Sequence, residues 1–105
     1  MKNKEIISTA KSNFGSLAPA FVKYTDQVLF GDCWRREDLS LRDRSLITVA
    51  ALIAGQNLGQ LDYHLKLAKE NGLKEEELIE AITHLAFYVG WPKAASALEI
   101  LKEAF

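Results

Sequence analysis

The stretch Ser40-Leu41-Arg42-Asp43-Arg44-Ser45-Leu46-Ile47-Thr48-Val49-Ala50-Ala51-Leu52-Ile53-Ala54 decides the fold. From Leu46 to Ala54 only Thr48 is polar, so the run predicts a helix that is apolar on almost every side. Such a helix is typical of a core element packed by neighbours all round. The run is too short to span a bilayer, which takes about 20 apolar residues. We therefore expect 41–54 to be the central core helix, with Ser40 as its N-cap.

Arg42 stands at the beginning of this helix, on the stripe that also carries Leu46, Val49 and Ile53. The spacing is four, three and four residues, which is the period of one helix face. A cation on a buried stripe must be compensated, because an unpaired buried charge is very costly. The compensating group is an acid, a set of carbonyls or a bound anion, and the sequence leaves these three alternatives open.

The rest of the chain also reads as helices, with Gly, Asn and Pro at the breaks. The expected ranges are 4–13, 18–29, 58–70, 74–89 and 91 to the C-terminus. Pro92 suits the first turn of the last helix, and Asn71-Gly72 is a good stop for the helix 58–70. Six helices with short connections predict a compact all-α fold, and the chain length predicts one domain over residues 1–105.

Composition excludes several classes of function. The formal net charge is −1, so no excess of Lys and Arg is available to neutralise nucleic-acid phosphates or an anionic membrane. Cys33 is the single cysteine, which excludes an intrachain disulfide and a cysteine-based metal site. The N-terminus has no apolar run typical of a signal peptide. We expect a cytoplasmic protein without a metal, a nucleic-acid partner or a membrane partner.

The segment His84–Trp91 is apolar or aromatic on all faces. Phe87 points nearly opposite to Leu85 on a helix. In a small domain a helix rarely has protein of its own chain on every side. The segment therefore predicts a subunit interface in a homo-oligomer.

Asn57, Gln60 and His64 are spaced three and four residues apart. They share one face if the helix already runs at Asn57, which would place an imidazole beside two amides. An imidazole can move a proton near neutral pH. The alternative, which the residues alone favour, is a half-buried histidine that bonds a carbonyl or a neighbouring side chain.

A second polar site is formed by His84 and Glu80, on a stripe with Tyr88. Glu80 could orient the imidazole, but a polar interface network is the stronger interpretation. Arginines also gather near the N-terminus of the core helix, at positions 35, 36, 42 and 44. Guanidinium groups there suit a carboxylate ligand, and simple salt bridges with neighbouring acids are the alternative.

With these residues in place, the chain resembles the carboxymuconolactone decarboxylase family. The resemblance rests on Phe30-Gly31-Asp32-Cys33-Trp34, on 39–48, on His64 with Ala68, and on 71–73, 75–80 and 84–92. It implies the all-α fold of the alkylhydroperoxidase D-like proteins, whose subunits assemble into trimers or hexamers. It also implies two activities, a decarboxylase and a thiol peroxidase.

The peroxidase activity of these relatives uses a CxxC pair followed four residues later by a histidine. His64 matches that histidine, but Asn57 and Gln60 stand at the two thiol positions. An amide cannot be a redox nucleophile, so the peroxidase interpretation fails at its central residues. Residual peroxidase activity through Cys33 has the least support.

The resemblance therefore favours a cofactor-free lyase that removes CO2 from a small carboxylated lactone or a related acid. His64 is the candidate catalytic proton donor. The candidate substrate-binding residues are Arg42, Arg44, Trp34, Asn57, Gln60 and Tyr88. The alternative is a non-enzymatic oligomeric binding or scaffold domain, which would be favoured if both arginines were tied to Asp or Glu.

Overall fold

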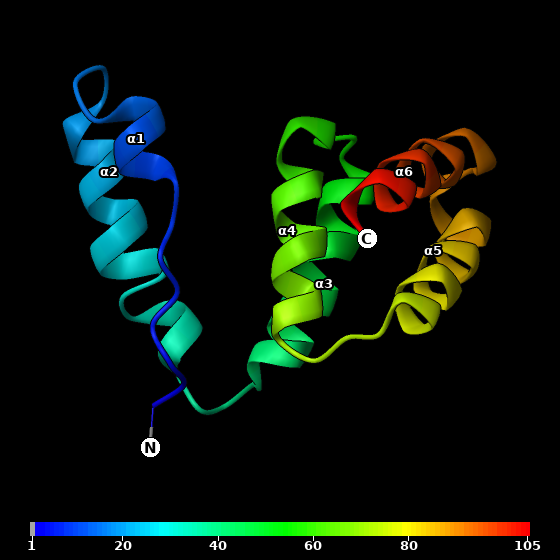
Figure 1. The fold of residues 1–105 in the computed structure, drawn as a ribbon, viewed down its shortest axis with the longest axis horizontal. Coiled ribbons are helices and arrows are strands. Elements are labelled where there is room, and N and C mark those ends of the chain that lie inside the picture. The colour runs from blue at the N-terminus through cyan, green and yellow to red at the C-terminus, as the bar shows by residue number, and fades with distance from the viewer. Residues whose placement is uncertain (1) are drawn as a thin grey trace. The chain divides into compact units, whose positions relative to one another are not determined.

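A computed structural model of the chain describes residues 2–105. Within that range all regular structure is helical, and six α-helices are present (Figure 1). This confirms the predicted all-α class. The chain divides into two compact units, and the boundary in the sequence lies between Leu41 and Arg42. The units are described separately below.

The first unit is built from short helical segments: α1 (Ala10–Phe14), α2 (Pro19–Tyr24), a π-helical turn (Thr25–Leu29) and a 3₁₀ turn (Cys33–Arg35). Phe14 and Phe21 pack edge to face with ring centroids 5.7 Å apart, and Phe30 packs on Trp34 at 5.6 Å. The predicted helix 18–29 is therefore found as α2 followed by the π-helical turn.

The predicted helix 4–13 is wrong over its first half, because α1 begins only at Ala10. The preceding residues run as irregular chain beside 34–39. The backbone N–H of Asn3 donates to the Arg35 carbonyl at 2.8 Å, and its side-chain amide donates to the Arg36 and Leu39 carbonyls at 3.0 and 3.1 Å. Ile6 is buried in this arrangement, so contacts distant in sequence outweigh local helix propensity.

The second unit contains α3 (Leu41–Ala54), α4 (Leu58–Glu70), α5 (Glu75–Val89) and α6 (Trp91–Ala104). These ranges confirm the predicted helices almost residue for residue. Helix α6 packs against both α4 and α5. The core contains fully buried side chains from all four helices: Val49, Ile53, Leu61, Leu65, Leu78, Ile82, Ala97 and Leu101.

The prediction that helix α3 is packed on every side is wrong. Val49 and Ile53 are buried in the core, whereas Ile47 on the other side of the helix is 56% exposed. The apolar run therefore supplies one core stripe and leaves a second apolar stripe uncovered in the single chain. In residues 2–105 no helix is both long and apolar enough to cross a membrane.

Candidate functional site

A hollow of the second unit lies between α3 and α5, and we call it the α3–α5 groove. Its volume is about 600 Å³, within the range of small-molecule sites. Apolar side chains form its floor: Leu46, Ala50, Leu73, Ala81 and Leu85. Charged and polar side chains stand around the floor, and they include three of the predicted site residues.

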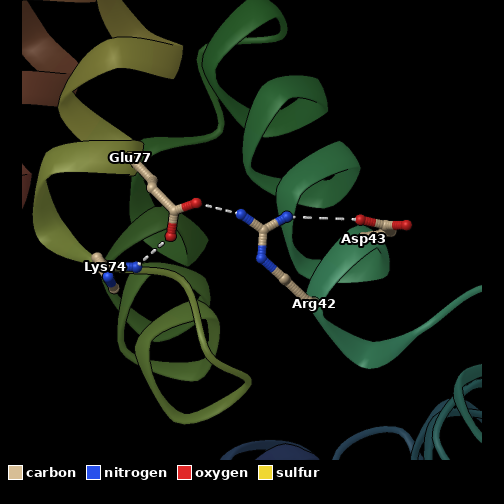
Figure 2. Close-up of polar contacts among 4 residues, drawn as sticks. All are labelled: Arg42, Asp43, Lys74 and Glu77. Atoms are coloured by element: carbon tan, nitrogen blue, oxygen red, sulfur yellow. Dashed lines mark hydrogen bonds and ion pairs between the residues drawn. The ribbon is translucent and has the colours of Figure 1, made fainter.

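Arg42 stands at one end of the groove and is compensated by acids (Figure 2). Its guanidinium donates to the Glu77 carboxylate and lies 3.7 Å from Asp43. The other Glu77 oxygen accepts the backbone N–H of Lys74 at 3.0 Å. This backbone bond, and after it Arg42, hold the pKa of Glu77 below its usual value. Of the three alternatives for Arg42, the structure selects the acid.

His84 and Glu80 line the same groove as Arg42. Glu76, Glu80 and His84 are spaced by four residues, so they form one stripe along α5. The His84 ring stacks on Tyr88 with centroids 5.0 Å apart and an interplanar angle of 31°. The structure thus brings the predicted second polar site together with Arg42, a combination that the sequence did not indicate.

His64 lies elsewhere, half-buried on α4, and packs edge to face with Tyr63 at 5.1 Å. It shares an α4 stripe with Ala68 and Asn71, at spacings of four and three. The Asn71 amide donates to the Ser45 hydroxyl at 2.9 Å, so this stripe turns toward α3. Burial lowers the pKa of His64, and the imidazole is therefore mainly neutral at neutral pH.

The other predicted residues have varied surroundings. Asn57 is the N-cap of α4, and both Asn57 and Gln60 are exposed. Arg44 is half-buried on α3, next to Ser45, and its carbonyl accepts the Thr48 hydroxyl at 2.7 Å. Trp34 is buried against Phe30 in the first unit.

The buried pair of Ser45 and Asn71 was missed by sequence reasoning. Ser45 is fully buried, and its position inside an apolar run was the available signal. Asn71 was interpreted only as part of a helix stop. No group of three or more His, Cys, Asp or Glu side chains in residues 2–105 is arranged to hold a metal ion.

Comparison with known proteins identifies the family. The model of the carboxymuconolactone decarboxylase family matches residues 19–103, across both units. The chain is 29% identical over 99 residues to 4-carboxymuconolactone decarboxylase of Acinetobacter baylyi, covering 94% of this chain and 74% of that protein. It is 32% identical over 74 residues to nitrosuccinic acid decarboxylase of Metarhizium robertsii, covering 70% of this chain and 52% of that protein. The chain therefore belongs to the carboxymuconolactone decarboxylase family.

Proposed function

We propose that the protein is a cofactor-free lyase that removes CO2 from a small carboxylated lactone or a related acid. The observation that carries this proposal is the agreement of two relatives, both named decarboxylases, within one family. The named substrates of both relatives are small carboxylic acids. We extend that substrate class, and not either particular compound, to this chain.

In the proposed reaction the bond between the carboxylate carbon and the substrate breaks, and its electron pair stays on the substrate as a carbanion or enolate. His64, as imidazolium, returns one proton to that carbon. Burial supports this role, because it lowers the pKa of His64 and makes the imidazolium a stronger acid. Turnover should then increase as the pH falls below the ordinary histidine value of 6.5.

The substrate carboxylate needs a cationic anchor. Arg44, half-buried on α3, is one candidate. Arg42 could serve only if the substrate displaced Glu77. We assign Asn57 and Gln60, exposed at the beginning of α4, to further substrate contacts.

The test is CO2 release from 4-carboxymuconolactone and from nitrosuccinic acid by the wild-type protein and by folded His64→Gln. A lost proton donor should lower the rate by about 10²–10⁴-fold. His84→Gln is the matched control, since it removes the other imidazole of the chain, and it should change the rate by less than about fivefold. Full turnover by His64→Gln would contradict the assignment.

The alternative is a non-enzymatic binding or scaffold domain. It is favoured by one observation, that Arg42 is bound to Glu77 and close to Asp43. This alternative predicts no CO2 release from either acid by a correctly folded oligomer. Measurable turnover that depends on His64 would exclude it.

We further propose that the protein is a homo-oligomer, a trimer or hexamer, that assembles through an aromatic patch. Phe87, Tyr88 and Trp91 are 79, 76 and 65% exposed, and Phe87 packs edge to face on Trp91 at 5.9 Å. Exposed aromatic clusters of this kind mark protein interfaces. Sedimentation at micromolar concentration should show an oligomer that Phe87→Glu dissociates, and a wild-type monomer would contradict the proposal. Cytoplasmic location stays a prediction, to be tested by cell fractionation.

A further inference from the structure

The α3–α5 groove has an apolar floor and an uncompensated negative wall. Arg42 is the one cation among its lining residues, and its charge is met by Glu77. Glu76 and Glu80 also line the groove, and neither carboxylate has a hydrogen bond or ion pair to another residue of the described chain. An anionic ligand would have to displace Glu77 and then lie beside three carboxylates. The charge of the groove therefore disfavours an acid.

We propose that the α3–α5 groove is a second ligand site, separate from His64, for a small apolar molecule that carries one ammonium group. The apolar body would cover Leu46, Ala50 and Leu85 on the floor. The ammonium group would meet Glu76 and Glu80, which lie one helical turn apart on α5. This inference is independent of the proposed decarboxylase activity, because His64 does not line the groove.

Two features of the groove support an ammonium group over a neutral polar group. An ammonium has three donors and no acceptor, and the α5 stripe offers two carboxylates and the imidazole of His84 as acceptors. The Arg42–Glu77 pair needs no rearrangement, since the ammonium group binds Glu76 and Glu80, which are not part of this pair. The volume of about 600 Å³ accommodates a two-ring aromatic body with its amine.

The experiment compares three probes of one shape and three charges: 1-naphthylmethylamine, 1-naphthylmethanol and 1-naphthoate. Isothermal titration calorimetry on the full chain at low salt and slightly above neutral pH gives the affinity of each. Exposed ion pairs contribute modestly, so the amine should bind about fivefold more tightly than the alcohol, and the acid least tightly. The preference for the amine should decrease with added salt.

Three variants locate the binding. Replacing both acids, Glu76→Gln with Glu80→Gln, should remove the preference for the amine and leave the affinity of the alcohol unchanged. Glu75→Gln is the matched control, because Glu75 precedes Glu76 on α5 and does not line the groove, and it should keep the preference. Ala50→Phe fills the floor and should weaken all probes.

Several results would overturn the inference. The acid could bind most tightly, which would make Arg42 the anchor of an anionic ligand. The amine could bind no better than the alcohol, or keep its preference in the double variant. Absence of binding by all three probes would also overturn the inference. CO2 release by the double variant distinguishes the two proposals, since loss of the amine site should leave the His64-dependent rate in place.

Discussion

Replacing Ser45 by Ala should destabilise the protein by more than the loss of one oxygen atom suggests. Ser45 is fully buried on α3, and its hydroxyl is the acceptor of the Asn71 amide at 2.9 Å. The other side-chain atom of that amide, Asn71 Oδ1, is buried and has no donor within the described chain. After Ser45→Ala, the side-chain amide of Asn71 would therefore keep no hydrogen bond to a side chain within residues 2–105.

The magnitude follows from the asymmetry of buried hydrogen bonds. Leaving one buried partner unsatisfied costs about 1–3 kcal/mol, whereas replacing both partners by apolar groups is nearly neutral. We expect about 2 kcal/mol for Ser45→Ala. The reverse change, Asn71→Leu, should cost less, because a serine hydroxyl in a helix can donate to the carbonyl four residues earlier. The double variant should lose less unfolding free energy than the sum of the losses in the two single variants.

Urea denaturation of the four proteins, at one protomer concentration, gives the double-mutant cycle. Equal concentration matters because an oligomer gains stability by mass action. The coupling between Ser45 and Asn71 should be about 1 kcal/mol or more. Additive losses, or a Ser45→Ala variant as stable as the wild type, would refute the reasoning that this pair is a buried, mutually dependent contact.

Three further predictions concern the core, a turn and an acid. Ile53→Ala removes a side chain with no exposed surface and should cost about 2–5 kcal/mol in urea denaturation. Gly90→Ala should cost about 1–3 kcal/mol because Gly90 has φ of 102°, whereas Gly59→Ala, where an added Cβ meets nothing within 4 Å, should be neutral or stabilising. The pKa of Glu77 is lowered from 4.5, so its contribution to stability is present above pH 4.5 and is lost as the pH falls through the lowered value. Glu77→Gln should therefore flatten the acid dependence of Tm, and an unchanged acid profile would contradict the stabilisation of the Glu77 carboxylate by the Lys74 backbone and by Arg42.

The helices of the second unit could be predicted because residues at the breaks themselves mark where each helix ends. Gly55 and Asn57 interrupt the apolar pattern between α3 and α4, and Gly90 with Pro92 separates α5 from α6. The positive φ at the first break is that of Gln56, 56°, and at the second break that of Gly90, 102°. No knowledge of distant contacts was needed.

The N-terminal helix could not be predicted in the same way. The segment before Ala10 has an amphipathic pattern, yet Asn3 is held by carbonyls more than thirty residues away. Its backbone N–H donates to the Arg35 carbonyl, and its side-chain amide donates to the carbonyls of Trp34, Arg36 and Leu39. Hydrogen bonds to such distant groups leave no trace in the local pattern. The irregular course of this segment is therefore a property of the folded first unit and not of the segment itself.

In the candidate site, too, the grouping of residues on one helix could be predicted from the sequence, whereas the contacts between helices could not. Spacing correctly grouped Glu80 with His84 on α5, and Arg42 with Leu46 on α3. It could not determine which helix faces each stripe. Consecutive residues on a helix are about 100° apart, so Ser45 bonds α4 while Leu46, one position later, lines the groove toward α5.

That rotation separates the two imidazoles into different environments. The α4 stripe of His64 turns toward α3, and burial lowers the pKa of His64. His84 is exposed in the α3–α5 groove, beside carboxylates. A proton donor to a carbanion benefits from a dry, acidic imidazolium, whereas the carboxylates beside His84 suit the binding of a cationic ligand. The opposed responses expected of His64→Gln and His84→Gln therefore follow from the packing of α3, and exchange of their roles in experiment would place the chemistry in the groove instead.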